Sequence, residues 1–337
     1  MNPPCFYIAG MTEDSSGGIF RCRWEGTPRI LDRTPLERSL FLSWGPDGKT
    51  LYAGARNNGH GAVAACRVAA DGGLTLRNML PSGGDSVCHL TVSADGGRLY
   101  CANYASGSFS EFLLNADGSL GKLNRVIAHR GRGIREEQRS PHPHCCVFTP
   151  NGGFLCVVDL GIDRMLLYEY DRSRGIAPVA AGVVALQPGS GPRHLCFDPS
   201  GRNAYLLHEL DCSLRHFRYA DGVFTPGSLT HTAKSAGSAA ASLRFSRNGR
   251  YLYAGTRGDD SISVFSVDDS GAPHWEQNFP TCGRSPRDFN FLPDCGILAV
   301  ANEFSGETVF FACDPDAGTI LDPRGRLAMP RPLYVLV

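Results

Sequence analysis

A repeat of roughly 50 residues runs along the chain and constrains its fold more than any other feature. Six segments share one plan, in which a short apolar run, a turn, a second apolar run and a polar loop follow one another. They read LSWGPDGKTLYAGAR, LTVSADGGRLYCANY, CVFTPNGGFLCVVDL, LCFDPSGRNAYLLHE, LRFSRNGRYLYAGTR and FNFLPDCGILAVANE. The turn residues, spaced by 48, 56, 49, 48 and 46 positions, are Asp47, Asp95, Asn151, Ser200, Asn248 and Asp294.

Each repeat predicts a β-hairpin, because Asp-Gly and Asn-Gly turns tolerate the positive φ that tight hairpins need. A third strand follows, as in SISVFSV (261–267), and then a weaker fourth that another Asp-Gly often opens. Four antiparallel strands at this period are typical of a β-propeller blade. No helical period persists, which argues against a helical solenoid. We therefore predict an all-β, seven-bladed β-propeller that forms a single domain over residues 1–337.

The two chain ends predict how the propeller closes. The segment FYIAGM (6–11) matches the second strands of the repeats, so the first blade lacks its first strand. The C-terminal segment PLYVLV (332–337) is a lone strand that can fill this place. Closure by both ends completes the seventh blade and removes the open sheet edges that promote aggregation.

Composition excludes several classes of protein. The 337 residues contain 33 Lys+Arg and 33 Asp+Glu, so the chain lacks the basic excess of a nucleic-acid binder. No apolar run is long enough to span a membrane, and MNPPCFYIAG does not have the pattern of a signal peptide. The thirteen cysteines show no CxxC spacing, and Cys101, Cys156 and Cys196 stand in apolar runs as expected buried hydrophobes. We expect a cytoplasmic protein with no nucleic-acid or membrane partner.

Titratable and amide side chains recur at the same places in different repeats. Seven residues before each turn residue stand Leu40, Cys88, His144, Arg193, Ala241 and Arg287. Nine residues after it stand Arg56, Tyr104, Leu160, Glu209, Arg257 and Glu303. Eight residues after it stand Ala55, Asn103, Asp159, His208, Thr256 and Asn302. In a propeller these positions share one face, so we expect them to meet at the channel mouth. Any single one could instead form a salt bridge between blades or tie a turn.

The long spacing of 56 reflects a charged stretch, IAHRGRGIREEQRS (127–140), just before the motif His-Pro-His. It is either a solvated loop or a flap over the mouth, whose Arg135 or Arg139 would meet an anionic substrate. We expect His144 to be the catalytic member of the histidine pair. His142 would be its neighbour, held at a fixed spacing by the proline between them.

These segments resemble the seven-bladed lactonase family, which includes propeller-type 6-phosphogluconolactonases and fungal 3-carboxymuconate-lactonizing enzymes. The resemblance covers essentially the whole chain and rests on SPHPHCCVFTPNGGFLCVVD, GPRHLCFDPSG with HELD, RFSRNGRYLYAGTRG, SPRDFNFLPD and CANYASGS. It implies an active site at His144, Arg193, Glu209 and Arg257, with Arg287 as a further candidate. The chain departs from the family pattern at His208, Thr256 and Glu137-Gln138. We add His142, His194, Asn103, Asp159 and Asn302 as candidate substrate-binding residues.

The expected reaction is hydrolysis of a small anionic lactone, most simply 6-phosphogluconolactone. His144 or Glu209 would be the base that activates water. Arg193 would stabilise the oxyanion, and Arg257 and Arg287 would grip phosphate or carboxylate. No metal or cofactor is required, and the protein is expected to be a monomer or a weak homo-oligomer.

Three alternatives stay open. A muconolactone-forming lyase would use the same acid–base and arginine groups. A metal-dependent lactonase could take His144, Glu209 and Asp159 as ligands, although nearby arginines would repel a cation. A non-catalytic interaction scaffold is the third, but Trp24, Trp44 and Trp275 do not stand in the Trp-Asp dipeptides of the best-known scaffold type.

Overall fold

The computed structural model describes residues 5–14, 16–232 and 235–337. Residues 1–4, part of the segment MNPPCFYIAG on which the signal-peptide prediction rests, lie outside this range. The chain divides into two compact units. The middle unit holds residues 12–18 and 34–193, and the terminal unit holds residues 1–11, 19–33 and 194–337. A single domain over residues 1–337 stays a prediction.

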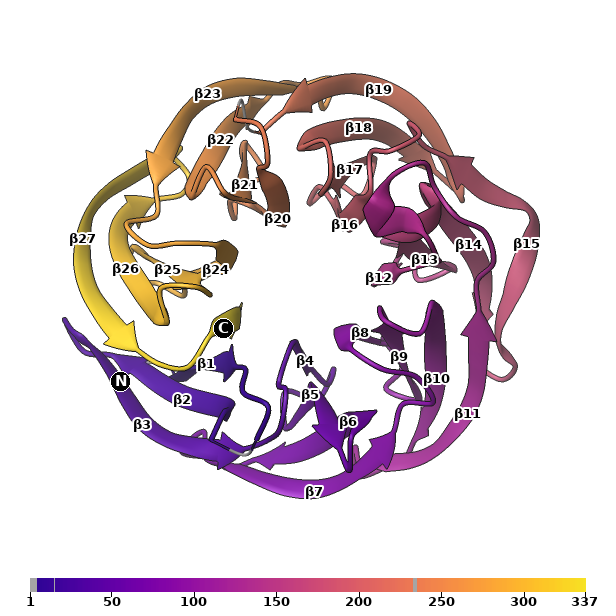
Figure 1. Ribbon diagram of the computed structural model, residues 1–337, viewed down its shortest axis with the longest axis horizontal. Coiled ribbons are helices and arrows are strands. Elements are labelled where there is room, and N and C mark those ends of the chain that lie inside the picture. The colour runs from indigo at the N-terminus through magenta and orange to yellow at the C-terminus, as the bar shows by residue number, and fades with distance from the viewer. Residues whose placement is uncertain (1–4, 15, 233–234) are drawn as a thin grey trace. The chain divides into compact units, whose positions relative to one another are not determined.

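The middle unit contains three four-stranded antiparallel sheets (Figure 1). The first sheet is β4 (Leu42–Trp44), β5 (Thr50–Asn57), β6 (His60–Val68) and β7 (Leu74–Pro81). The second is β8 (Val87–Val92), β9 (Arg98–Asn103), β10 (Ser108–Leu114) and β11 (Leu120–Ala128). The third is β12 (Pro143–Phe148), β13 (Phe154–Asp159), β14 (Arg164–Asp171) and β15 (Gly175–Ala185). Two single-turn 3-10 helices precede and follow the β12–β13 hairpin, η1 (Glu136–Gln138) and η2 (Leu160–Ile162).

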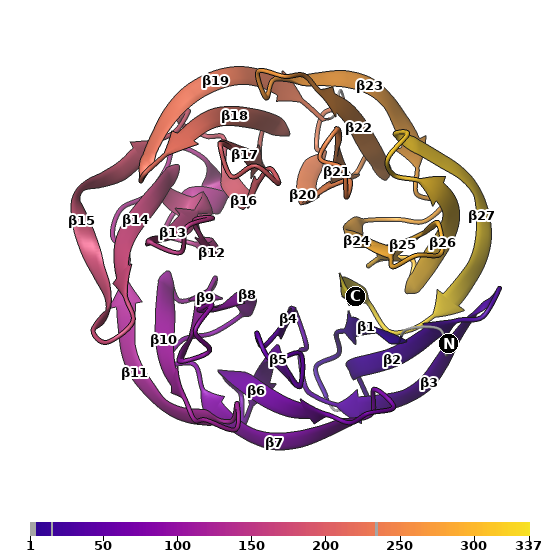
Figure 2. The same cartoon turned by 180° about the vertical axis from the view of Figure 1, so that it is seen from behind.

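The terminal unit contains four sheets, seen from the other face in Figure 2. Three follow the chain order. They are β16 (Pro192–Phe197), β17 (Asn203–His208), β18 (Ser213–Ala220) and β19 (Val223–His231); β20 (Ala239–Phe245), β21 (Tyr251–Arg257), β22 (Ser261–Val267) and β23 (Pro273–Pro280); and β24 (Pro286–Leu292), β25 (Ile297–Asn302), β26 (Glu307–Asp314) and β27 (Thr319–Ala328). Strand β16 begins at the unit boundary, since Pro192 and Arg193 are counted in the middle unit.

The fourth sheet of the terminal unit joins the two chain ends. Its order is β28 (Pro332–Leu336), β1 (Cys5–Gly10), β2 (Gly18–Trp24) and β3 (Pro28–Pro35). Tyr7 pairs with Leu336 and Ile8 with Val335 in an antiparallel ladder, and Figure 1 shows the two strands side by side. The described residues thus form seven four-stranded sheets, which confirms the predicted propeller and its closure by the C-terminal strand.

Burial follows strand position within each sheet. Strands β9 and β25 are buried along their whole length, and each carries a central apolar run. Strands β3 and β11 show exposed positions throughout, because they are the outermost members of their sheets. Apolar side chains fill the space between successive sheets, for example Tyr100, Phe109, Leu155 and Tyr168 between the second and third sheets of the middle unit.

A tyrosine five residues after the turn links neighbouring blades within each unit. The hydroxyl of Tyr52 donates to the carbonyl of Gly118 at 2.7 Å in the middle unit. In the terminal unit Tyr205 donates to Gly271 O at 2.7 Å and Tyr253 to Pro315 O at 2.9 Å. Each bond satisfies a polar atom of an otherwise buried ring.

Candidate active site

His144 and Arg287, two candidate residues of the innermost strands, stand at β-bulges. Pro143 and Cys145 of β12 pair with the adjacent residues Asp159 and Val158 of β13. His144, which lies between them, therefore has no partner of its own in β13 and is the bulged residue. Arg287 is the corresponding extra residue of β24, between Pro286 and Asp288. A bulge re-aims one side chain out of the regular alternation, and proline is tolerated beside it. The repeated sequence position therefore corresponds to a repeated backbone irregularity.

His144 and Arg193 meet in the middle unit. Both are buried, with 2% and 4% of their surface exposed. Nη1 of Arg193 lies 2.5 Å from Nε2 of His144. A guanidinium has no acceptor, so Nε2 of His144 must accept, and the imidazole is neutral with its proton on Nδ1. Nε2 is therefore the unprotonated nitrogen of the ring, and the Arg193 guanidinium occupies its lone pair.

Tyr104 organises both histidines of the His-Pro-His motif. Its ring stacks on His142 at 4.5 Å between centroids and 17° between planes, and meets His144 edge-on at 5.5 Å. Nδ1 of His142 donates to the backbone carbonyl of Tyr104 at 2.8 Å. Tyr104 shares a repeat column with Glu209 and Arg257 but was not among the predicted site residues. Its aromatic character, alone in that column, was the available signal.

The segment 127–140 is anchored at its C-terminal end. Gln138 has no exposed surface, and its amide donates to the carbonyl of Leu160 and to the carboxylate of Asp163, both at 2.8 Å. Arg139 pairs with Glu136 at the exposed surface. At Gly189, an added Cβ would lie 3.2 Å from Nε of Arg135, so Arg135 covers the loop that precedes Arg193.

Asp159 organises the backbone around His142. Its carboxylate accepts from His142 N at 2.7 Å, from Gly161 N at 2.9 Å and from Nδ1 of His129 at 2.6 Å. Tyr168 lies 3.4 Å from the other nitrogen of His129. Burial raises the pKa of the Tyr168 phenol to about 12, so this hydroxyl stays protonated and can donate. The carboxylate predicted to touch substrate is thus buried and used inside the blade.

The two predicted asparagines are also buried in their blades. Nδ2 of Asn103 donates to the hydroxyls of Ser108 and Ser110 at 3.2 and 2.8 Å. Nδ2 of Asn302 donates to the carbonyl of Thr281 at 3.3 Å. A glycine packs against each asparagine, Gly84 against Asn103 and Gly283 against Asn302. A Cβ added to either glycine would lie within about 3 Å of the asparagine side chain. Equivalent positions in two blades therefore have equivalent structural partners.

His194, half-buried on β16, belongs to the terminal unit.

Glu209 and Arg257 form an ion pair in the terminal unit, with Nη2 of Arg257 2.9 Å from Oε1 of Glu209. About one sixth of each side chain is exposed, so the pair is reachable from solvent. The same Nη2 donates to the carbonyl of Ala240 at 3.3 Å. His208, which precedes Glu209, is buried and lies 3.0 Å through Nδ1 from the hydroxyl of Ser213. This departure from the family pattern therefore points into the blade.

Arg287 shares a carboxylate with Arg331. Its Nη1 lies 3.4 Å from one oxygen of Glu303, and Nη2 of Arg331 lies 2.5 Å from the other. Glu303 is only 4% exposed, whereas 27% of the Arg287 side chain is exposed. Two guanidinium groups against one carboxylate leave a net positive charge. Glu303 and Arg331 were not among the predicted site residues, since their pairing depends on β28 closing the fold.

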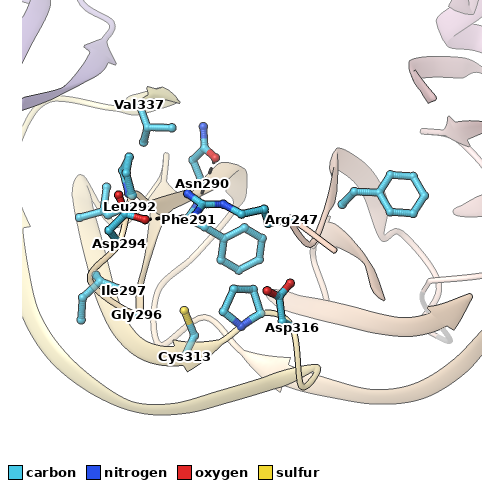
Figure 3. A pocket seen from close by; sticks show the side chains of 13 residues that line it. Arg247, Asn290, Phe291, Leu292, Asp294, Gly296, Ile297, Cys313, Asp316 and Val337 are labelled. Atoms are coloured by element: carbon cyan, nitrogen blue, oxygen red, sulfur yellow. Dashed lines mark hydrogen bonds and ion pairs between the residues drawn. The ribbon is translucent and has the colours of Figure 1, made fainter. Parts of the chain in front are cut away.

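A separate cavity of about 350 Å³ lies in the terminal unit at the turn ends of the sheets (Figure 3). Phe291, Cys313 and the C-terminal Val337 line it, and Arg247 pairs with Asp294 at its edge at 3.1 Å. None of the candidate site residues lines this cavity. Its charged side chains are largely exposed and already paired, so we assign it no part in the reaction.

Two further observations concern ligands and membranes. Within residues 5–14, 16–232 and 235–337, no three His, Cys, Asp or Glu side chains are grouped so as to hold a metal ion. Over the same residues, no helix is long and apolar enough to cross a membrane.

The seven sheets define a propeller, and each unit carries its own pair of candidate residues, His144 with Arg193 in the middle unit and Glu209 with Arg257 in the terminal unit. Residues 5–337 match the family model described as Lactonase, 7-bladed beta-propeller. The chain therefore belongs to this lactonase family.

Relatives and solved structures agree with that assignment over nearly the full length. The chain is 32% identical to a 6-phosphogluconolactonase of Bacillus subtilis, over 98% of this chain and 97% of that one. It is 31% identical to a 6-phosphogluconolactonase of Formosa agariphila, with 84% and 83% covered. The structure of a periplasmic gluconolactonase of Pseudomonas aeruginosa superposes with a TM-score of 0.93 at 29% identity, covering 98% of both chains.

Proposed function

We propose that the protein is a lactone hydrolase that converts 6-phosphogluconolactone to 6-phosphogluconate. The observation that carries the proposal is the contact between the neutral ring of His144 and the guanidinium of Arg193. The contact supports the proposal because a proton acceptor and a positive charge are the two groups that ester hydrolysis needs. Family membership and the two 6-phosphogluconolactonase relatives support the choice of substrate.

The reaction follows from these two groups. The oxygen of a water molecule bonds to the lactone carbonyl carbon while His144 takes a proton from it. Arg193 turns its Nη1–H from the imidazole to the developing oxyanion, and this movement frees Nε2 of His144 for the proton. The tetrahedral intermediate then collapses, the ring carbon–oxygen bond breaks, and the proton on His144 passes to the leaving alkoxide. Ring opening thus gives one hydroxyl and one carboxylic acid, which releases the second proton of the water to solvent and becomes a carboxylate.

The other candidates are given supporting roles. Glu209 is the alternative base, and it forms an ion pair with Arg257 at 2.9 Å. Arg257 and Arg287 are proposed to bind the phosphate, because a guanidinium can form two parallel hydrogen bonds to it. His142 is proposed to contact the substrate with its orientation fixed by Tyr104. No metal or cofactor has a step in this reaction, and we propose a cytoplasmic location.

A substrate panel tests the proposal. Purified protein is assayed with 6-phosphogluconolactone, unphosphorylated gluconolactone and a muconolactone, each with and without a chelator. We expect the phosphorylated lactone to give the highest kcat/KM, with no loss after chelation. Turnover of the muconolactone alone would establish the lyase instead, and loss of activity on chelation would establish the metal-dependent alternative. Absence of any turnover, together with a stable protein partner in pull-downs, would establish the scaffold.

His144→Gln is the matching variant, because glutamine keeps the size and polarity of the side chain without its basicity. We expect kcat/KM to fall by about 10²- to 10⁴-fold, the usual contribution of a general base. His274→Gln is the control, since this side chain is 60% exposed and pairs with Asp268 in a surface turn.

A further inference from the structure

Asp163 is a buried carboxylate of the middle unit to which the reaction described above gives no role. It follows the single turn η2 and adopts a left-handed conformation, with φ and ψ both 50°. Only 6% of its surface is exposed. Left-handed backbone is costly for most residues but tolerated by Asp and Asn. The position therefore selects a short polar side chain, and the contacts of that side chain explain why.

Four donors from two separate segments converge on this carboxylate. Oδ2 accepts from Gly189 N at 2.7 Å. Oδ1 accepts from Gly191 N at 2.8 Å and lies 3.3 Å from the hydroxyl of Ser190. Oδ1 also accepts from Nε2 of Gln138 at 2.8 Å, so the segment 127–140 is attached to the same group. An ionised carboxylate is the only side chain of this size that accepts at every one of its lone pairs.

The clamped loop leads directly into the candidate site. Gly191 is followed by Pro192 and then by Arg193, whose Nη1 contacts His144. Proline fixes φ, so the direction of the chain between the clamp and Arg193 has little freedom. The loop is also held through the backbone, since Leu186 N donates to Asp163 O at 3.1 Å. A displacement of residues 189–191 would therefore move Arg193 relative to His144.

We propose that Asp163 is a positioning residue for the lactonase reaction: it sets the place of Arg193 against His144 by clamping the loop 189–191 to the segment 127–140. The expected effect on kcat/KM rests on the proposed function, whereas the effect of Asp163 on the place of Arg193 does not. Misplacing a catalytic group by about 1 Å can cost 100-fold in rate, so a clamp two residues from Arg193 bears directly on catalysis.

Asp163→Asn is the sharpest variant, because asparagine tolerates the same backbone conformation. An asparagine side chain has one acceptor oxygen and one NH₂ group, whereas the carboxylate has two acceptor oxygens. The NH₂ group must therefore face a donor, either Gly189 N or the groups that donate to Oδ1, and at least one hydrogen bond is lost. We expect kcat/KM for 6-phosphogluconolactone to fall about 10- to 100-fold. In an Arg193→Ala background the same change should alter kcat/KM less than about twofold, because the group being positioned is absent. Equal losses in both backgrounds would reduce Asp163 to a stabilising role and overturn the proposal.

A spectroscopic measurement keeps this test independent of turnover. The ¹⁵N resonance of His144 Nε2, in histidine-labelled protein, reports whether Arg193 donates to it. We expect Asp163→Asn to shift this resonance toward that of Arg193→Ala. Asp95→Asn is the matched control, since Asp95 accepts from Ser93, Gly97 and Tyr170 in a hairpin turn and should leave the resonance unchanged. An unshifted resonance in Asp163→Asn would overturn the clamp even if the protein hydrolysed no lactone.

Ser190→Ala covers the case in which Asp163→Asn does not fold. It removes one hydroxyl donor at 3.3 Å and leaves three donors in place. We expect a two- to threefold loss of kcat/KM that disappears when Arg193 is alanine. A loss that persists in that background would contradict the proposal. If wild-type protein proved inactive on every lactone while the His144 resonance responded as expected, the proposed function would fail and the positioning role would stand.

Discussion

His144 accepts a hydrogen bond from Arg193 through Nε2, at 2.5 Å, with both side chains almost fully buried. This arrangement fixes the tautomer of the imidazole, and in the proposed reaction the same guanidinium would turn to the oxyanion. A protonated His144 could not accept this bond, so the resting site is prepared to take a proton rather than give one.

Tyr104 should affect activity through its ring. Tyr104→Phe keeps the stacking on His142 and the edge contact with His144, whereas Tyr104→Leu removes both. We expect the leucine variant to lose about 1 kcal/mol of stability and about 10-fold in kcat/KM, since aromatic pairs contribute about 0.5–1.5 kcal/mol. Steady-state kinetics and urea unfolding measure the two effects. A leucine variant that matches the phenylalanine variant in both would refute this role.

Gly161 should not tolerate a side chain. An added Cβ would lie 2.0 Å from Ser140 O and 2.8 Å from His142 N, which are backbone atoms of the segment leading to His144. We expect Gly161→Ala to lower the free energy of unfolding by about 1–3 kcal/mol and to reduce kcat/KM by displacing that segment. Gly153→Ala is the control, because its nearest neighbour would be 3.4 Å away. Equal stability of the two variants in urea would argue against the close approach.

His216 should make stability depend on pH. Burial, reinforced by the charge of Arg218, lowers the pKa of this imidazole below 6.5. Its Nε2 lies 2.9 Å from Oδ1 of Asn203, which suits the neutral ring as donor. As the pH falls, His216 therefore takes up a proton in the unfolded chain before it does so in the folded protein. The contribution of neutral His216 to the free energy of unfolding is complete above pH 6.5 and is lost as the pH falls through the folded-state pKa. Thermal unfolding between pH 7.5 and 5 should show a smaller decline in Tm for His216→Gln. The exposed-site variant His60→Gln should decline like wild type.

The closing strand β28 should depend on a buried ion pair. Asp288 accepts twice from Nη2 of Arg244, at 2.9 and 3.0 Å, and also from Val335 N at 3.0 Å. Breaking one partner of a buried pair typically costs about 3–5 kcal/mol, so we expect a loss of that size in Asp288→Asn. Asp294→Asn, at a side chain that is 80% exposed, should cost less than about 1 kcal/mol. Guanidinium unfolding of the two variants checks the difference.

The fold was predictable because each blade repeats a turn that only a few residues can make. Gly48, Gly96, Gly152 and Gly249 all have positive φ in the observed hairpins, as the Asp-Gly and Asn-Gly turns require. The closing strand was predictable for a related reason, since a lone strand at one end matched a missing strand at the other.

The site was predictable in part. One repeat column contains both His144 and Arg193, and the structure brings these two side chains into contact, while their catalytic roles stay predictions. The repeat columns could not predict that the side chains of Asn103 and Asp159 point into the blade. A shift of one residue in strand pairing, as at a bulge, turns a side chain to the opposite face of the sheet. Asp163 lies outside every column. Its role depends on a loop 26 residues later, which no local pattern reveals.

The most direct test of the central claim is a double-mutant cycle on 6-phosphogluconolactone with His144→Gln, Arg193→Ala and the combined variant. Because the two groups act in one step, we predict that each single change lowers kcat/KM by at least about 100-fold. The combined loss should be far smaller than the product of the single losses. A His144→Gln protein that hydrolyses the lactone at the wild-type rate would contradict the account.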